Sequence, residues 1–213
     1  MVDPHVIERR TQAERSATTR TALLAAATEI ILRDGNADVR LVEVAAHAGL
    51  TKGAIQHHFA TKTELLAALV EAGWRDLIRR LDGEEPGRQS IDDRIDRLID
   101  TMWASYSGPA TMAAYTIALT LGHEPELRRL HEHAFRAARD TLERQWAEAF
   151  DDLGIPPDDL RRARRFARTH IAGIIAHLRI DPDAPPAAVQ LATLKAAIGD
   201  ILTKGNARSG GPV

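Results

Sequence analysis

Cysteine is absent from this sequence of 213 residues, and so is any apolar run that approaches the roughly 20 residues needed to cross a membrane. The absence of cysteine excludes disulfides, thiolate metal ligands and a cysteine nucleophile. The N-terminal segment also lacks the apolar core of a secretory signal. We therefore expect a cytoplasmic protein that has no membrane partner.

Signals for β-structure are lacking as well. β-Branched residues form only short runs, and no hairpin signal or internal repeat is visible. Alanine, leucine and arginine are frequent, and these residues favour helix. Hydrophobic residues make up 44% of the chain, which is typical of a globular protein and not of a disordered one. The sequence thus predicts an all-α fold.

The chain has no overall excess of positive charge, since its formal net charge is −2 at pH 7. The charge is unevenly distributed, however. Residues 1–81 contain 11 Lys and Arg against 10 Asp and Glu, and residues 50–63 contain two lysines and two histidines but no acid. DNA binding requires a local basic surface and not a basic protein as a whole. Nucleic-acid binding therefore remains open, with residues 50–63 as its candidate surface.

The segment from Arg40 to Lys62 reads as two short helices joined by a tight turn. Apolar residues recur at helical spacing before Gly49, which predicts a helix that ends at a left-handed glycine. Thr51 is a natural N-cap for a second helix, in which Ile55 and Phe59 would pack against the first. Small or polar residues remain on the outer side: Lys52, Gly53, Gln56 and His57. A short helix with such a face fits a major groove, so the segment predicts a helix-turn-helix.

This segment also resembles a known family. From Arg20 to about Leu81 the sequence resembles the DNA-binding domain of the TetR (tetracycline-repressor) family, and the spacing agrees over about forty residues. The matching residues are Ala26, Ala27, Gly35, Val44, Ala45, Ala48, Gly49, Leu50, Thr51, Lys52, Gly53, His58, Phe59 and Lys62. A helical hairpin with no role in DNA binding is the alternative interpretation.

The resemblance implies which residues face DNA. Phosphate contacts are implied for Thr51, Lys52, His58 and Lys62, and close approach of the backbone is implied at Gly53. Arg40 stands where the family usually has a Thr or Ser that touches a phosphate, and arginine would do so with a longer reach and a full charge. Gln56 stands where the family often has tyrosine. Our hypothesis is that Gln56 and His57 read base edges, because glutamine can form two hydrogen bonds to adenine; a merely solvated Gln56 is the alternative.

We expect three parts in the chain. Residues 1–81 would hold a polar, mobile arm up to about Ser16, the DNA-binding domain and a connecting fourth helix. The arginines of this arm, Arg9, Arg10, Arg15 and Arg20, would be solvated or would reach DNA. Residues 82–204 would form a helical domain for effector binding and dimerisation, after a break at residues 82–87. Residues 205–213 would be a disordered tail.

About nine helices are expected from the helical periodicity, the cap residues and the prolines. The first would run from Thr18 to Arg33, and the fourth would open with a capping box between Thr61 and Glu64. The later helices are expected at 90–106, 110–121, 125–152, 157–179 and 186–204. The five arginines between 161 and 168 are interpreted as a solvated or ion-paired face.

The family resemblance also implies a cavity for a small inducer among the middle helices. Such pockets are mostly apolar with a few polar groups. The candidate ligand-binding residues are Met102, Trp103, Tyr106, Met112, Tyr115, Thr116, Leu119, Trp146, His170 and His177. A plain hydrophobic core is the alternative for the aromatic residues, and ordinary hydrogen bonding is the alternative for the histidines. The histidine spacing matches no metal motif, so we expect neither a metal nor a cofactor.

The last two long helices carry small and apolar residues that would pair with their copies in a homodimer, as the resemblance implies. The candidate interface residues are Phe166, Thr169, Gly173, Ala176, Leu191, Leu194, Ile198 and Ile201. Burial within one subunit is the alternative. No nucleotide loop, catalytic triad or carboxylate pair supports an enzyme. The sequence therefore predicts a ligand-responsive DNA-binding regulator; a helix-turn-helix protein whose second domain only dimerises is the alternative.

Overall fold

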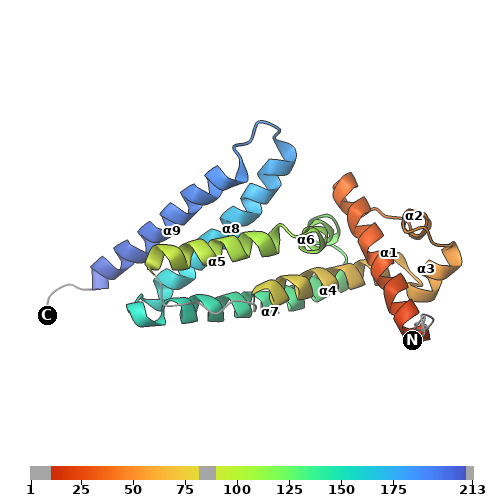
Figure 1. Cartoon of the computed structure of the whole chain (residues 1–213), viewed down its shortest axis with the longest axis horizontal. Helices are drawn as coiled ribbons and strands as arrows, with labels where there is room; N and C mark the ends of the chain where they lie inside the picture. The colour runs from red at the N-terminus through yellow and green to blue at the C-terminus, as the bar shows by residue number, and fades with distance from the viewer. Residues whose placement is uncertain (1–10, 82–89, 210–213) are drawn as a thin grey trace, which may run out of the picture.

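The computed structural model describes residues 11–81 and 90–209, with side chains as far as Thr203. Regular structure in these two ranges is all helical, as predicted, and comprises nine α-helices and one short 3-10 turn (Figure 1). The elements are α1 (Gln12–Asp34), α2 (Leu41–His47), α3 (Lys52–His58), α4 (Lys62–Leu81), α5 (Ile91–Tyr106), α6 (Pro109–Leu121), α7 (Pro125–Ala149), the 3-10 turn η1 (Asp151–Leu153), α8 (Pro157–Ile180) and α9 (Ala187–Ser209). No helix within the described ranges is long and apolar enough to cross a membrane.

Helix α1 starts earlier than the sequence pattern predicted. Thr11 and Glu14 form a capping box, in which the Thr11 side chain accepts from the Glu14 amide and the Glu14 carboxylate accepts from the Thr11 amide. The expected start at Thr18 was wrong because this polar cap precedes the apolar stripe. The helix ends at Gly35, whose φ of 67° is left-handed, as the glycine rule predicts. Residues 1–10 of the predicted arm lie outside the described residues.

Helices α1, α2 and α3 fold around one small core and together form the head of the molecule. The buried side chains include Leu23 and Ile30 from α1, Val44 from α2, and Ile55 and Phe59 at α3. These residues have less than 2% of their surface exposed, so the inner side of α3 is anchored in this core. Helices as short as α2 and α3 would be marginally stable in isolation. Burial of their apolar side chains in this core, which contributes about 25 cal/mol per Å², is what stabilises them.

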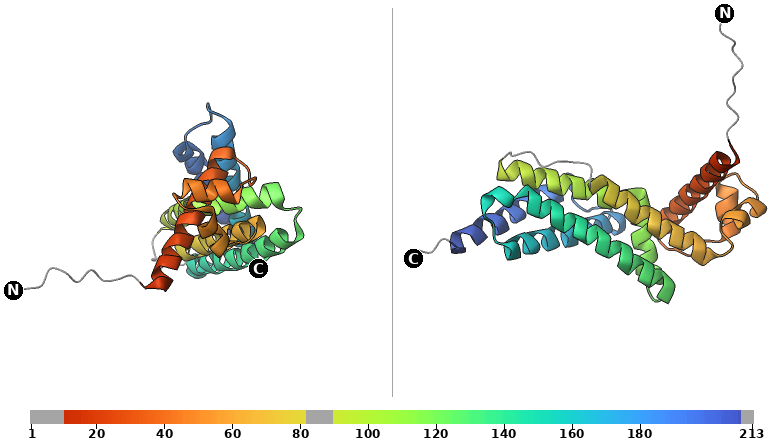
Figure 2. Two further views of the ribbon diagram at one scale, coloured as in Figure 1. Left: turned by 90° about the vertical axis from the view of Figure 1, so that its right-hand side faces the viewer. Right: turned by 90° about the horizontal axis from the view of Figure 1, so that it is seen from below.

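Helix α4 connects this head to the rest of the chain. It packs against α6 and α7; α7 runs alongside α4, whereas α6 is seen end-on in Figure 1 and crosses α4 (Figures 1 and 2). At Gly73 the backbone of α4 comes so close to Ala110 of α6 that a Cβ atom would collide with the Ala110 carbonyl oxygen. The hydroxyl of Thr111 donates to the Gly73 carbonyl oxygen at 3.3 Å. The α4–α6 contact is therefore tight at one point, which lies near the middle of α4.

Helices α5, α8 and α9 form the other end of the molecule, with α9 packed against α8 and α5 (Figure 1). Buried Arg94 of α5 donates to the Ala149 carbonyl oxygen at 2.8 Å and pairs with Asp152, which ties α5 to the end of α7. The backbone of α9 continues to Ser209, so residues 205–209 are helical and the predicted disordered tail is corrected there. The expected domain break at 82–87 lies outside the described residues.

Candidate nucleic-acid interface and effector region

The turn between α2 and α3 has the predicted geometry. Gly49 has a φ of 68°, a left-handed conformation that residues with a Cβ atom rarely adopt. The amide of Leu50 donates to the Ala45 carbonyl oxygen at 2.8 Å, which closes the end of α2. Thr51 caps α3, because its hydroxyl accepts from the Ala54 amide at 3.2 Å. The two helices are thereby held in one fixed arrangement.

Helix α3 has one buried and one exposed side. Ile55 is completely buried, and the side of the helix away from it is exposed at Lys52, Gly53, Gln56 and His57. The helix carries no acidic residue in its first turn, so only positive or neutral groups lie on the exposed side. A surface of this shape and charge can enter a major groove and approach phosphates.

His58 and Phe59 complete the end of α3. His58 is half-buried, and burial lowers the pKa of its imidazole, with smaller contributions in the same direction from the charges of His57 and Arg20. A neutral His58 would act as a hydrogen-bond donor or acceptor and not as a cation. The Arg20 guanidinium lies 4.6 Å from the centre of the Phe59 ring, which places this basic residue of α1 beside α3.

Lys62, predicted to bind a phosphate, opens α4 next to this surface. Its Nζ lies 2.7 Å from Oδ1 of Asp38, an exposed aspartate in the connection between α1 and α2. The predicted capping box is only half formed. The Thr61 hydroxyl accepts from the Glu64 amide at 3.1 Å, but the Glu64 carboxylate accepts from the Ala60 amide and not from that of Thr61. The predicted phosphate contact of Lys62 would therefore have to replace its ion pair with Asp38.

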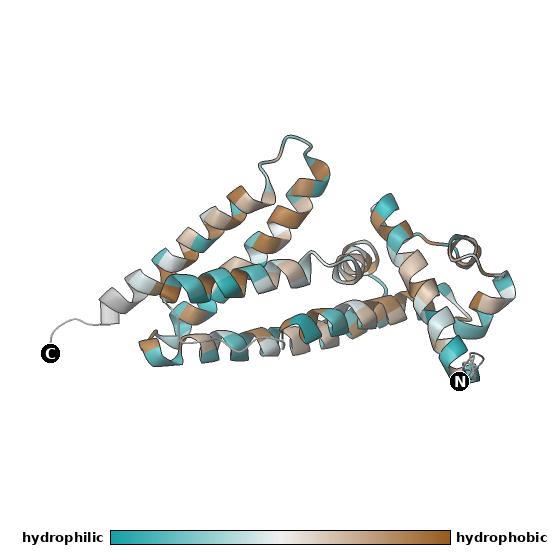
Figure 3. Cartoon of the chain, in the orientation of Figure 1, coloured by the Kyte–Doolittle hydropathy of each residue, from teal (hydrophilic) through white to brown (hydrophobic). Residues whose placement is uncertain are grey.

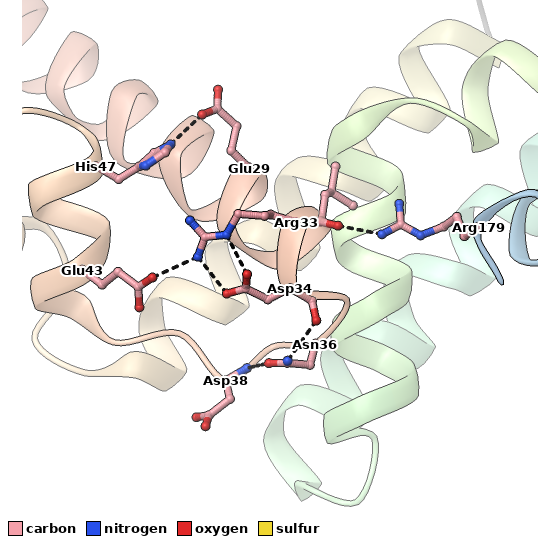
Figure 4. A network of polar contacts seen from close by, with 9 residues as sticks. Glu29, Arg33, Asp34, Asn36, Asp38, Glu43, His47 and Arg179 are labelled. Carbon is pink, nitrogen blue, oxygen red and sulfur yellow. Dashed lines mark hydrogen bonds and ion pairs between the residues drawn. The ribbon is translucent and has the colours of Figure 1, made fainter. Parts of the chain in front are cut away.

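Polar contacts hold α1 and α2 together behind the interface (Figure 4). Arg33 at the end of α1 pairs with Asp34 and with Glu43 of α2. Nε2 of His47 lies 2.7 Å from a carboxylate oxygen of Glu29. Arg40 itself is exposed at the N-cap position of α2 and makes no side-chain cap there. Its guanidinium remains accessible on the surface next to α2.

The predicted ligand-binding residues occupy very different environments. Met102, Tyr106 and Trp146 are buried, whereas Trp103, Met112, Tyr115 and Thr116 are half-buried. Leu119 was expected to share their face, but 83% of its surface is exposed near the end of α6. His170 and His177 are also exposed; His170 is hydrogen-bonded to the Phe166 carbonyl oxygen, and His177 to the side chain of Asp181, the residue that follows α8. These three residues therefore do not line an interior cavity of the subunit.

An aromatic cluster brings five rings together between α4, α5, α6 and α7. Its members are Trp74, Tyr106, Tyr115, His131 and Phe135, whose neighbouring ring centres lie between 5.1 and 6.3 Å apart. Nε1 of Trp74 donates to Nδ1 of His131 at 3.3 Å. The hydroxyl of Tyr115 is buried and makes no hydrogen bond within the described chain. The cluster is thus apolar, with one unsatisfied polar group.

Two arginines of α8, which were predicted to be solvated or ion-paired, are buried or half-buried. Arg164 is 6% exposed, pairs with Glu143 at 3.1 Å and donates to the Arg139 carbonyl oxygen. Arg168 is half-buried, with its guanidinium 5.2 Å from the centre of the Phe135 ring. Arg164 fits the ion-paired alternative of the prediction, although it is buried, whereas half-buried Arg168 has no printed ion pair; each follows by one residue an alanine of the buried stripe of α8. Arg168 therefore borders the aromatic cluster.

The predicted dimer residues divide into two groups. Leu191, Leu194 and Ile198 are buried inside the subunit, where α9 packs on α8 and α5, so they offer almost no surface to a second subunit. Phe166 and Ile201 are half-buried, and Thr169, Gly173 and Ala176 are exposed on α8. The nearby exposed apolar residues are Leu178, Ile180 and Val189, next to the connection between α8 and α9 (Figure 3).

Four residues at the aromatic cluster were not identified from the sequence as ligand candidates. Trp74 continues the apolar stripe of α4, His131 was considered only as a metal ligand, and Phe135 carries no local signal. Arg168 was grouped with the other arginines of α8. The position of Arg168 could have indicated its burial, because it follows Ala167 of the apolar stripe of α8, whose opposite side is polar.

A helical head with a turn fixed by glycine and an outward, acid-free second helix defines the class of helix-turn-helix DNA-binding transcriptional regulators. Residues 23–69 match the family model described as bacterial regulatory proteins, tetR family. Residues 23–69 are therefore a DNA-binding domain of the TetR family type.

Characterised relatives agree with this assignment. The chain is 29% identical to the HTH-type transcriptional regulator CymR of Pseudomonas putida over 152 residues, 71% of this chain and 75% of CymR. It is 42% identical over 62 residues to the HTH-type transcriptional repressor BepR of Brucella suis biovar 1 (strain 1330), which is 29% of each chain. The fold is shared with FadR of Bacillus subtilis, solved in complex with stearoyl-CoA, with a TM-score of 0.61, 17% identity, and coverage of 86% of this chain and 97% of FadR. These relatives are regulators of transcription.

Proposed function

We propose that this protein is a cytoplasmic repressor that binds a palindromic operator as a homodimer and is released from it by a small-molecule inducer. The observation that carries the proposal is the division of α3 into a buried inner side at Ile55 and an exposed, acid-free outer side. A helix anchored in this way presents its outer side to a major groove without losing its own core.

Contacts with DNA divide into positioning and reading. Phosphates are held by residues that carry a charge or a donor near the groove: Arg40, Thr51, Lys52, His58 and Lys62. Gly53 lets the backbone approach, since it carries no side chain on the exposed side of α3. Gln56 and His57 reach base edges, and a two-bond contact from Gln56 to an adenine contributes on the order of 1–3 kcal/mol of discrimination.

Dimerisation uses the exposed side of α8 and the apolar residues beside it. Thr169, Gly173 and Ala176 form a surface of small groups on α8, and Ile180 leaves 80% of its surface exposed at the end of this helix. Small residues allow helices to approach closely, and a two-fold dimer buries the same patch on both subunits. Two-fold symmetry of the reading heads then requires a palindromic operator.

Release by an inducer requires that the inducer bind more tightly to the form of the dimer that does not fit the operator. The aromatic cluster supports such a site, because the buried Tyr115 hydroxyl lacks an acceptor for its hydrogen, which a ligand could supply. A protein of the same fold, FadR of B. subtilis, was solved with stearoyl-CoA. By linkage, operator DNA must weaken inducer binding by the same factor by which inducer weakens DNA binding.

A helix-turn-helix protein whose second domain only dimerises is the competing function. The two proposals differ in one measurable property, because only a sensor changes its operator affinity when a small molecule binds. A protein whose operator affinity is insensitive to every compound that binds it would have the second function.

The experiment that tests the proposal is a selection of bound sequences from random duplex DNA with the purified chain, carried out at one fixed salt concentration. We expect a palindrome with two half-sites. Gln56→Ala should relax the preference at one position per half-site, whereas Lys52→Ala should weaken all sequences alike. Enrichment of no motif by a folded protein would reject operator binding, and an unchanged preference in Gln56→Ala would reject the reading role of this residue.

A further inference from the structure

We infer that the inducer is an organic anion with an apolar body, whose acidic group binds at Arg168 and Tyr115 while its body lies among the rings of the aromatic cluster. This inference rests on the proposed function and adds to it the chemical class of the ligand.

The arginines of α8 differ in how their charge is neutralised. Arg161 and Arg162 pair with the aspartates one turn earlier in α8, and Arg164 pairs with Glu143. Arg168 forms no ion pair with any residue that the structure describes, although it is half-buried. A charge that is partly removed from water without a counter-ion is costly. An anionic ligand would supply the counter-ion.

The second observation is the hydroxyl of Tyr115. It is buried and forms no hydrogen bond of normal geometry; the polar groups that act on it, Arg168 and Tyr106, are donors, so its own hydrogen has no acceptor, and an unsatisfied buried donor costs about 1–3 kcal/mol. Burial raises the pKa of this phenol, and the positive charge of Arg168 is the largest influence that opposes the shift. Tyr115 therefore stays protonated at neutral pH and lies within the electrostatic reach of Arg168. A carboxylate between the two groups would accept from both.

The remaining polar group of the cluster is also a donor. Nδ1 of His131 accepts from Trp74, so in the neutral ring Nε2 carries the hydrogen. Glu132, the next residue of α7, is exposed, and Glu143 is paired with Arg164. Glu132 acts on His131 from the exposed side, but no described carboxylate is among the groups that act on the Tyr106 and Tyr115 hydroxyls. Donors without acceptors, in a region of positive charge, select anions and disfavour cations.

The rings determine the body of the ligand. The rings of Trp74, Tyr106 and His131 lie with their centres 5.4 to 6.3 Å from that of Tyr115. Phe135 extends this apolar surface, since its ring centre lies 5.4 Å from that of Trp74. A neutral aromatic molecule could contact these rings but would leave Arg168 without a counter-ion. A hydrophilic anion such as inorganic phosphate would satisfy Arg168 but lose the apolar contacts. An acid with an aromatic or aliphatic body satisfies both.

The test compares acids with matched amides by calorimetric titration of the full chain. The probes are 2-naphthoate against 2-naphthamide, and decanoate against decanamide, so that the two pairs distinguish a flat from a flexible body. We expect at least one acid to bind about tenfold or more tightly than its amide, as a charge-assisted contact implies. Arg168→Met should remove this preference, and Tyr115→Phe should reduce acid affinity several-fold.

Arg165→Met is the matched control, because Arg165 is exposed on the same helix and its loss changes net charge equally. Arg168→Lys guards against a folding defect, since it should retain part of the preference for acids. Equal affinity for acids and amides, absence of acid binding by a protein that melts cooperatively, or equal behaviour of the Arg168→Met and Arg165→Met proteins would overturn the inference. Operator binding is measured separately: acid binding that leaves operator affinity unchanged supports the anion site and rejects the inducer function.

Discussion

Arg179 of α8 donates a hydrogen bond from Nη2 to the carbonyl oxygen of Leu32 in α1, across 2.7 Å in space and 147 positions in sequence (Figure 4). Leu32 lies in the last turn of α1, where carbonyl groups lack partners within the helix. A cation at this end also interacts favourably with the helix dipole. The contact therefore joins α8 directly to α1, the helix against which the helix-turn-helix packs.

Replacing Arg179 with methionine should loosen the end of α1. Loss of about 1 kcal/mol of local stability should accelerate amide exchange about fivefold in the turn closed by the Gly35 amide. Hydrogen-exchange mass spectrometry measures this effect. Arg165→Met, which removes an exposed charge of the same helix, should leave α1 unchanged. Identical exchange in both variants would show that the contact has no effect on α1.

Asp38 should weaken DNA binding by competing for Lys62. Asp38→Asn is expected to tighten binding several-fold at low salt, because it frees the lysine and removes a negative charge near the phosphates. Lys62→Met should weaken all sequences alike and reduce the salt slope by about one. Asp140→Asn, on the exposed side of α7, is the control with the same change in net charge. Equal affinities of the Asp38→Asn and Asp140→Asn proteins would contradict the competition.

The two glycines of the helix-turn-helix should respond in opposite ways to alanine. Gly49→Ala should lower the free energy of unfolding by about 1–2 kcal/mol, because a Cβ atom strains its left-handed backbone although no atom lies within 4 Å of that position. Gly53→Ala should leave stability equal or slightly higher, since Gly53 lies in a helix and a Cβ atom would have ordinary contacts. It should nevertheless weaken operator binding. Chemical denaturation and DNA titration of both variants separate these effects.

Stability should decrease between neutral and mildly acidic pH, with His131 as a contributor. Burial lowers the pKa of its imidazole, so the unfolded chain binds the proton more readily. The stabilisation by neutral His131 is therefore present above the ordinary histidine pKa of about 6.5 and is lost as the pH falls below that value towards the lowered one. Protonation also converts Nδ1 into a donor, which breaks the hydrogen bond from Trp74.

Denaturant unfolding at pH 7.5 and 5.5 measures this effect. His131→Gln should flatten the pH dependence relative to His133→Gln, which removes an exposed histidine two positions along α7. His58, whose pKa is also lowered by burial, should leave a residual dependence of the same sign in both variants. A dependence that is the same in both proteins would exclude His131 as its source.

The DNA-reading head was the part that the sequence predicted best. Gly49, Thr51 and Ile55 have short-range signals, a left-handed turn, a cap and an apolar spacing, and all three are confirmed in the structure. The start of α1 was misplaced because the apolar stripe begins later than the polar cap at Thr11. The half-formed cap of α4 depends on where the backbone before Thr61 lies, which residue spacing does not specify.

Helices α5 to α9 were less predictable. When a helix is buried on several sides, its hydrophobic pattern does not show which side faces which neighbour. Two residues lie in environments opposite to those expected. The charged Arg168 borders the aromatic cluster, and the apolar Leu119 is exposed. The same limit applies to α9, where Ile198 faces the subunit core although its spacing fits an interface equally well. The roles of the predicted DNA, ligand and dimer residues remain predictions that the experiments above test.

The close contact between Gly73 and Ala110 gives α4 a fixed point about which it would turn in any rotation against α6. Eleven residues separate Gly73 from Lys62, a distance of about 16 Å along the helix axis at 1.5 Å per residue. A rotation of about 10° around the contact would displace the Lys62 end by about 3 Å, close to the 3.4 Å rise of one base pair per strand. Two such rotations in a symmetric dimer would change the separation of the reading heads by up to twice that length, so a motion too small to disturb packing at α6 would still be large on the scale of a half-site.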